Sequence, residues 1–329
     1  MLARGSAHAT SRLCLRCLLL RRPRLPPSST SRAVPSSSAV ASPVPGVDVD
    51  AFTVVTPAGT TVHIRQATRG GAYRFGLDAL LLATDVTAAA QSPEEGLSIV
   101  DLGAGCGVAG LCVALRHSPS RLLAVEVQPT LAALAEHNLQ AAQQAIYAPC
   151  ADWRVVHADV RHTDAWLSPE LAGNADLVVC NPPFFAAHGS AAARTERQAG
   201  RQELHGCLAD FLAAAAACLH PSAGRAKFVV PPARLAELLA NSSGLHVHSL
   251  RFVHASPQVD AYLVEAVLRR QPCGGGGLLV RPALCVRDDA GFYTPEVALR
   301  LATAAGAAAA QDEVERIRKT CVSVKQAER

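Results

Sequence analysis

Four polar side chains stand at regular intervals, each where an apolar run of the sequence ends. They are Asp101, Glu126, Asp159 and Asn181, separated by 25, 33 and 22 residues. Each separation suits one strand followed by one helix, so the four residues are expected at the ends of successive parallel strands. Ligands of open α/β sheets bind in the crevice outside the carboxyl ends of the strands. The spacing therefore predicts one ligand site lined by three carboxyl groups and one carboxamide.

The stretch DLGAGCG at residues 101–107 follows the first of these apolar runs. Its glycines, Gly103, Gly105 and Gly107, permit a tight turn and a close approach of a ligand to the backbone. A dinucleotide fingerprint requires a glycine where Val108 stands. The loop therefore argues for a nucleotide-like ligand other than NAD.

The two acids beyond the glycine loop suit a bound nucleoside. Glu126 lies 23 residues after Gly103, and a carboxylate at this strand end accepts hydrogen bonds from both ribose hydroxyls in doubly wound folds. Asp159 ends the third apolar run. Its carboxylate can accept a hydrogen bond from an adenine amine, or alternatively cap the helix that follows.

Alternating strand-like and helix-like segments must position these residues. Strand-like apolar runs occupy residues 97–103, 122–127, 153–160, 175–181 and 226–230. Alternation of this kind predicts an α/β fold whose parallel sheet is covered by helices on both faces. Two later runs, at 246–254 and 261–270, are separated by a gap too short for a crossover helix, so they are expected to pair antiparallel. Residues 278–300 are expected to add a small strand and a turn.

Composition restricts the possible partners and the compartment. Residues 1–47 contain seven arginines, no lysine and no acid, which is typical of a transit peptide to a plastid or a mitochondrion. The whole chain has a formal net charge of +4, so the remainder carries −3. The remainder is therefore no globally basic nucleic-acid binder, and any RNA contact must come from a local patch. No zinc-ligand spacing and no membrane-length apolar run is present.

DLGAGCG, Glu126 and the segment Asn181-Pro182-Pro183-Phe184 together resemble a class I S-adenosylmethionine-dependent amino-methyltransferase. The resemblance implies a Rossmann-like, seven-stranded sheet, mostly parallel with its last strand antiparallel, helices on both faces and a small N-terminal hairpin and lid. It implies S-adenosyl-L-methionine as the cofactor. Its predicted contacts are Asp78, Asp101, Gly103, Gly105, Gly107, Glu126, Asp159 and Asn181.

In that family the segment after the fourth strand binds a planar amine, whose nitrogen is a poor nucleophile because its lone pair is delocalised. The Asn181 side-chain oxygen and the Pro182 carbonyl can accept hydrogen bonds from its two N–H groups, which favours a more pyramidal nitrogen. Pro182 and Pro183 keep these acceptors aimed because proline fixes φ near about −65°. Phe184 can stack on a base, which contributes roughly 1–3 kcal/mol. The chemistry requires no metal.

Further segments, including residues 73–83 around Asp78 and FYTPEV at 292–297, resemble the bacterial tRNA1(Val) (adenine-N6)-methyltransferases. This resemblance covers residues 50–300 and implies methylation of an adenine amine in a tRNA anticodon loop. The expected partner is that single-stranded loop, without a membrane or a metal, and the protein is expected to be a monomer or weak dimer. Candidate RNA contacts are Arg194, Arg197 and Arg201, which follow the catalytic segment.

These features divide the chain into four parts. The expected boundaries are a transit peptide at 1–47, a hairpin and lid helix at 48–95, the methyltransferase domain at 96–300, and a terminal helix and tail at 301–329.

Two other functions remain open at this point. A protein glutamine-N5 methyltransferase acting on release factors uses the same loop chemistry, but such enzymes carry a helical N-terminal domain for which residues 48–95 are too short. A non-catalytic S-adenosylmethionine-binding subunit of an RNA complex would have no use for an intact Asn181-Pro182-Pro183-Phe184 segment.

Overall fold

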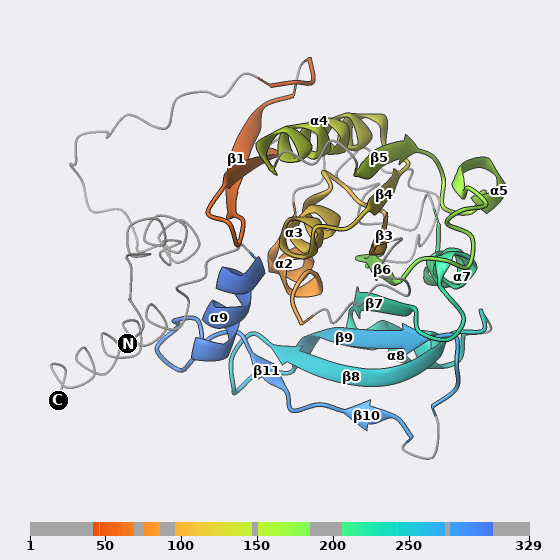
Figure 1. Ribbon diagram of the computed structural model, residues 1–329. Coiled ribbons are helices and arrows are strands. Elements are labelled where there is room, and N and C mark those ends of the chain that lie inside the picture. Colours follow the sequence, from red (N-terminus) through yellow and green to blue (C-terminus); the bar gives the residue numbers. More distant parts are fainter. Residues whose placement is uncertain are drawn as a thin grey trace, which may run out of the picture.

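A nine-stranded sheet, parallel except for one strand, forms the centre of the molecule (Figure 1). The computed structural model describes residues 42–45, 47–68, 75–85, 96–146, 151–184, 206–241, 243–273 and 277–304. The strand order is β10-β8-β9-β7-β6-β3-β4-β5, and β11 also pairs with β8. The order reverses at β3, whose neighbours are β4 and β6. This is the doubly wound, Rossmann-like arrangement that the alternation of the sequence predicts.

Five parallel strands correspond to the five apolar runs. They are β3 (Ser98–Leu102), β4 (Arg121–Glu126), β5 (Asp152–His157), β6 (Leu177–Cys180) and β7 (Arg225–Val230). The expected antiparallel pair is also present as β8 (His246–His254) and β9 (Ala261–Arg269), with β9 lying antiparallel between β7 and β8.

Two short strands extend the sheet beyond the seven that were expected. They are β10 (Leu279–Val280) and β11 (Leu284–Cys285), and both run parallel to β8. Both lie within residues 278–300, where a small strand and a turn were expected. Strands of two residues are too short for an alternating pattern to fix their number and bounds.

Helices cover both faces of the sheet and enclose two hydrophobic cores. The first core is covered by α2 (Leu77–Leu82), α3 (Val108–His117), α4 (Pro129–Ile146) and α9 (Pro295–Ala304). The second is covered by α5 (Thr163–Trp166), α7 (Leu208–Cys218) and α8 (Leu235–Leu239), which follows the 3-10 turn η2 (Pro232–Arg234). Neighbouring strand residues alternate between the cores, since Val179 belongs to the first and Val178 to the second.

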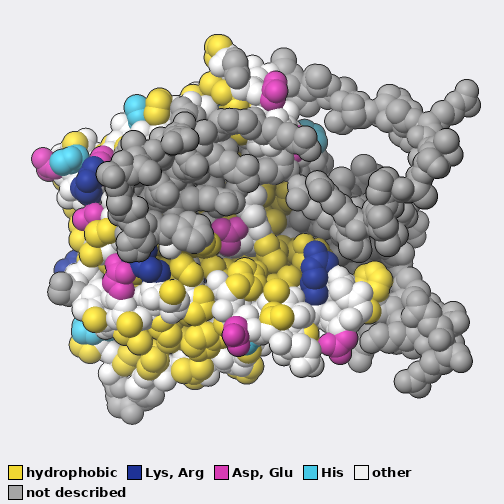
Figure 2. All heavy atoms as spheres, turned by 180° about the vertical axis from the view of Figure 1, so that it is seen from behind, with side chains coloured by type: hydrophobic (Ala, Val, Ile, Leu, Met, Phe, Trp, Pro, Cys, Tyr) yellow, Lys and Arg dark blue, Asp and Glu magenta, His cyan; other side chains and the backbone are white. Residues whose placement is uncertain are grey.

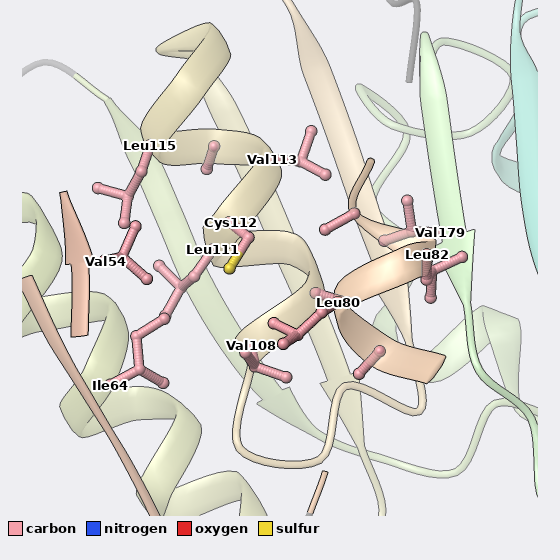
Figure 3. Packing of buried hydrophobic residues seen from close by; sticks show 14 of the residues in the cluster. Val54, Ile64, Leu80, Leu82, Val108, Leu111, Cys112, Val113, Leu115 and Val179 are labelled. Atoms are coloured by element: carbon pink, nitrogen blue, oxygen red, sulfur yellow. The ribbon is translucent and has the colours of Figure 1, made fainter. Parts of the chain in front are cut away.

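The N-terminal hairpin of β1 (Val49–Val55) and β2 (Thr61–Ala67) packs against the first core. Figure 3 shows α3 between Val54 and Ile64 of this hairpin and Leu80 and Leu82 of α2. The fully buried Asn138 of α4 adds polar contacts. Its amide bonds both backbone groups of Arg65 and also donates to the Cys106 carbonyl, each at 2.8 Å. One side chain therefore joins the hairpin to the glycine loop.

The C-terminal helix differs from expectation. α9 begins at Pro295, so it crosses the expected domain boundary after residue 300. The local sequence explains this start, because the Thr294 hydroxyl accepts a hydrogen bond from the Val297 amide, proline occupies the first helical position and Glu296 lies in the first turn. The leader through residue 41, residues 86–95 of the expected lid region and everything beyond 304 lie outside the described residues.

Two further observations concern membrane-spanning helices and cysteines. No helix in the described ranges is both long and apolar enough to cross a bilayer. The cysteines within these ranges are all free thiols; Cys106, Cys112, Cys180 and Cys218 are buried, as expected for small core residues, and Cys207 is half-buried.

Candidate active site

A cavity of about 320 Å³ opens at the carboxyl ends of β3, β4 and β6. Its volume lies in the range of about 300–1,000 Å³ that is usual for small-molecule sites. Of the residues predicted from the sequence, it brings together Asp78, Asp101, Gly103, Gly105, Glu126, Asn181, Pro182, Pro183 and Phe184. Elements distant in the chain thus meet at the edge where the sequence placed a ligand.

The glycine loop adopts a conformation that side chains would oppose. Gly103, Gly105 and Gly107 have φ of 68°, 58° and 82°, all in the left-handed region. Gly107 does not line the cavity; a Cβ there would lie 3.3 Å from Leu139 of α4. Gly107 therefore permits helix packing, whereas Gly103 and Gly105 form the wall of the cavity.

Glu126 is held with its carboxylate in the cavity wall. Its two oxygens accept hydrogen bonds from the Gly105 and Gln128 amides, each at 2.8 Å, and the residue is only 4% exposed. Burial raises the pKa of Glu126, while these N–H groups act in the opposite direction. Each carboxylate oxygen can accept a further hydrogen bond. Glu126 can therefore still receive the two hydroxyls of a ribose.

Asp101 lies deeper, at 2% exposed. Burial raises its pKa to about 7, opposed by a hydrogen bond from the Gly110 amide and reinforced by the charge of Glu126. A side chain at Gly110 would place its Cβ 2.8 Å from the Asp101 carboxylate, so only glycine permits this contact. Near neutral pH the group is thus poised between its neutral and charged forms.

The structure places Asp159 differently from the other strand-end acids. The Arg161 side chain bonds its carboxylate at 3.0 Å, which lowers the pKa of Asp159. The neighbouring Val160, rather than Asp159, lines the cavity. The predicted contact with an adenine amine stays a prediction.

Asn181 carries the chemically most informative contact. Its side-chain Nδ2 donates to Oδ2 of Asp78 at 2.9 Å, and its Oδ1 is buried without a hydrogen-bond partner among the described residues. A carboxylate only accepts hydrogen bonds, so Asp78 fixes the orientation of the amide and leaves the oxygen for the cavity. A buried unpartnered acceptor costs about 1–3 kcal/mol. The site therefore holds an acceptor ready for a donor that a ligand must supply.

The rest of this segment surrounds the same space. Pro182, Pro183 and Phe184 all line the cavity, and Phe184 also packs against the first core. Asp78 was expected to support the methionine end of the cofactor, and in the structure its described partner is Asn181. Arg194, Arg197 and Arg201, the candidate RNA contacts, lie outside the described residues.

Among the cavity-wall residues that were not identified from the sequence are Gln128, Phe75 and Phe211. Gln128 has a buried Oε1 without a hydrogen-bond partner among the described residues. Phe75 is held edge-on against Phe52, with ring centroids 5.4 Å apart, and Phe211 of α7 lies beneath Gly103. Gln128 lies two residues after the end of β4, so the reasoning that found the other strand-end residues could also have found it. The two rings come from segments whose position only the tertiary structure determines.

The wall composition suits S-adenosyl-L-methionine. Acceptor oxygens of Asp101, Glu126, Gln128 and Asn181 gather on a cavity that is otherwise largely apolar, which fits a ligand that carries hydroxyl donors and positive charge. Within the described ranges, no three His, Cys, Asp or Glu residues cluster so as to hold a metal ion.

Comparison with known proteins decides the family. Residues 75–224 match the family model "Methyltransferase small domain". The chain is 30% identical over 233 residues, 69% of its length, to the tRNA1(Val) (adenine(37)-N6)-methyltransferase of Porphyromonas gingivalis, of which it covers 86%. The chain belongs to this methyltransferase family. It is therefore an S-adenosylmethionine-dependent methyltransferase.

Two further similarities concern part of the sequence and the fold. The release factor glutamine methyltransferase of Mycolicibacterium smegmatis is 39% identical over 97 residues, which is 30% of each protein. A predicted O-methyltransferase from Agrobacterium tumefaciens shares the fold, with a TM-score of 0.51 and 22% identity over 70% of this chain and 97% of that one.

Proposed function

We propose that this methyltransferase transfers a methyl group to the exocyclic amine of an adenine in the anticodon loop of an organellar, valine-type tRNA. The observation that carries the proposal is the buried, unpartnered Oδ1 of Asn181 in the cavity wall, oriented by Asp78. An amino group is the complementary donor. The relative that covers most of the chain is named for an adenine-N6 position of a tRNA, which supports RNA as the substrate.

Acidic side chains that backbone amides already fix in the cavity wall would hold the cofactor. S-adenosyl-L-methionine, when bound, supplies a methyl group activated by a positively charged sulfur. Glu126 would accept the ribose hydroxyls, because its two oxygens are fixed by the Gly105 and Gln128 amides. Gln128 Oε1 is a second buried acceptor on the same wall. The pKa of Asp101 is raised to about 7, so a positively charged ligand nearby would favour its ionised form near neutral pH.

The amine end depends on Asn181 and the two residues that follow it. Asn181 Oδ1 accepts one N–H of the target amine, and the Pro182 carbonyl accepts the second. This draws the nitrogen toward a pyramidal state with a usable lone pair, while Phe184 stacks on the ring. The nitrogen releases its surplus proton after transfer, so the chain needs no strong base.

An anticodon loop is a favourable place for this chemistry. Its bases are already unpaired, so turning one into a cavity costs little free energy. The arginine-rich, acid-free leader supports import of the protein into a plastid or a mitochondrion. The substrate would then be a tRNA of that organelle.

The test is methyl transfer from radiolabelled S-adenosyl-L-methionine to defined acceptors. The full chain is incubated with organellar valine tRNA, with the same transcript carrying guanine at each anticodon-loop adenine in turn, and with an organellar release factor. Label is expected in the tRNA and lost with one adenine substitution. Absence of label from tRNA, with active cofactor binding, would contradict the proposal.

A second candidate is glutamine-N5 methylation of a release factor. It is favoured by the local similarity to a release factor glutamine methyltransferase, and the same Asn181 oxygen could hold a side-chain amide. That similarity is confined to 30% of each chain, whereas the tRNA-enzyme similarity covers 86% of the relative. Label in the release factor but not in tRNA would establish this alternative.

A further inference from the structure

A second cavity, of about 260 Å³, lies on the sheet beside the C-terminal end of α2. It shares no lining residue with the first cavity. Its wall carries five basic side chains against two acids, a formal net charge of +3. The basic residues are Arg225, Lys227, Arg251, Arg269 and Arg281.

Both acids of this cavity are already engaged by buried cations. Glu265 contacts Lys227 at 3.1 Å and Arg300 at 2.9 Å, and Asp85 lies 3.6 Å from Arg251 and 3.3 Å from Arg300. Arg251 also pairs with a third acid, Glu296, outside the cavity wall. Lys227 and Arg251 are thus compensated from within the fold. Among the described residues, Arg269 and Arg281 have no acid partner, so the charge of these two arginines is left without compensation there.

Arg269 also faces another arginine, Arg225, across neighbouring strands. Ala226 of β7 pairs with Leu268 of β9, so Arg225 and Arg269 come next in register, opposite one another. Burial and the charge of Arg269 lower the pKa of Arg225. Like charges directly opposite on antiparallel strands are destabilising. The Nε of Arg269 is also buried without a hydrogen-bond partner among the described residues.

We propose that this cavity binds a phosphate group, held chiefly by Arg269 and Arg281 with Arg225 beside them. A planar guanidinium matches the oxygens of a phosphate through two parallel hydrogen bonds. The volume is below the usual range of about 300–1,000 Å³ for small-molecule sites, which favours one phosphate group over a whole nucleotide. A bound anion would relieve the repulsion between Arg225 and Arg269 and supply the partner that Arg269 Nε lacks.

The phosphate source that fits best is the backbone of the substrate tRNA, and this part of the inference rests on the proposed function. The chain beyond residue 47 carries −3, so RNA must be attracted locally. Figure 2 shows Lys and Arg scattered singly over the described side chains of one face, without a broad basic surface.

The second cavity lies away from the amine site but within reach of one RNA. Cys180 pairs with Phe228, so Asn181 follows at about the level of Val229. Arg225 lies four residues earlier on β7, or about 13 Å along the strand direction. The phosphate would therefore belong to a nucleotide several positions from the methylated base, or to another part of the folded tRNA.

The experiment compares Arg269→Gln and Arg281→Gln with a matched control, Arg270→Gln. Arg270 adjoins Arg269 but is exposed and does not line the cavity. Inorganic phosphate is titrated against the full chain at constant ionic strength, with chloride as the competing anion, and binding is followed by calorimetry. The affinity for tRNA is measured in parallel at several salt concentrations. Binding of the cofactor shows that each variant is folded. Because Arg281 is exposed at the edge of the sheet, Arg281→Gln is expected to leave the buried strands intact.

Both cavity variants are expected to lose phosphate binding and to weaken tRNA binding roughly tenfold, with a salt slope smaller by about 1. Arg270→Gln is expected to change neither. Lost phosphate binding with unchanged tRNA affinity would identify free phosphate as the ligand. Phosphate binding that is absent from the parent chain, or unchanged in both variants, would overturn the site. Failure of the proposed function shows separately, as absence of methyl label in tRNA while the phosphate titration is unaffected.

Discussion

The two cavities on the sheet have opposite polarity. The cavity at the carboxyl edge collects acceptor oxygens, from Asp101, Glu126 and Asn181 among others. The second collects donors, including Arg269 and Arg281. Helix α2 connects them, because its Asp78 lines the first cavity and Asp85, which follows the helix, lines the second.

The two cavities differ in which of their polar groups already have partners within the protein. In the first, backbone amides fix the carboxylates, and oxygens remain unpartnered, as with Asn181 Oδ1. In the second, ion pairs such as Lys227–Glu265 satisfy several groups internally, and Arg269 and Arg281 have no acid partner among the described residues. The first therefore suits a cation that also carries N–H and O–H donors, and the second suits an anion.

Removal of the Asn181 side-chain oxygen is expected to have the largest effect on the first cavity. Asn181→Ala is expected to lower the rate of methyl transfer by at least about 100-fold, because a preorganised acceptor for the reacting amine is lost. Cofactor affinity should stay near that of the parent, as measured by calorimetry. Asn174→Ala, in a turn remote from the cavity, is the control and should change neither quantity. If cofactor binding disappeared as well, Asn181 would be structural and its assigned role wrong.

Glu126→Ala tests the cofactor half of the acceptor cavity. Loss of two charge-assisted hydrogen bonds to a ribose is expected to raise the Kd for S-adenosyl-L-methionine roughly 10–100-fold. The transfer rate should largely recover at saturating cofactor. Glu136→Ala, on the outer part of α4, serves as the control. Unchanged cofactor affinity in Glu126→Ala would remove the ribose assignment.

Asp78→Ala distinguishes the two roles available to this acid. If Asp78 orients Asn181, as its 2.9 Å contact indicates, kcat should fall roughly tenfold while cofactor affinity changes little. Asp78→Asn keeps an acceptor and should restore much of the rate. A selective loss of cofactor affinity would instead support the expected contact with the methionine end. The measurement is kcat together with the cofactor Kd for each variant.

The pH dependence of stability should differ in sign between the cavities. In the folded protein the pKa of Asp101 is raised to about 7. Its contribution to the free energy of unfolding is therefore fully present below about pH 4 and is lost as the pH rises through 7. Burial lowers the pKa of Lys227 to about 8, so the contribution of Lys227 is present above about pH 10.5 and lost as the pH falls through 8.

Denaturant titrations at several pH values measure these slopes. Asp101→Asn should abolish the loss of stability between about pH 4 and 7, and Lys227→Met the gain between about pH 8 and 10.5, each amounting to a few kcal/mol at most. A parent slope that survives either substitution would assign the titration to other groups.

Much of the fold was predictable because strong local patterns agreed with the tertiary structure. Five apolar runs became the five parallel strands, since a strand buried on both faces needs continuous apolar residues. The short gap after residue 254 correctly indicated an antiparallel pair. The start of α9 at Pro295 was missed although Thr294-Pro295-Glu296 is a helix-start signal. One small strand was expected within residues 278–300, and two are present there, β10 and β11, each too short to give a pattern that fixes its bounds.

The sequence by itself determined which polar groups stand at the strand ends, because chain spacing and parallel pairing bring those ends to one edge. Only the tertiary structure decided which of them face the ligand. Asp159 turns to Arg161, and Asp78, 103 residues before Asn181, comes within hydrogen-bond distance of it. In the second cavity, Arg225 and Arg269 come opposite one another through the register of β7 and β9. Side-chain contacts between distant segments depend on packing and register, which no local stretch of sequence specifies.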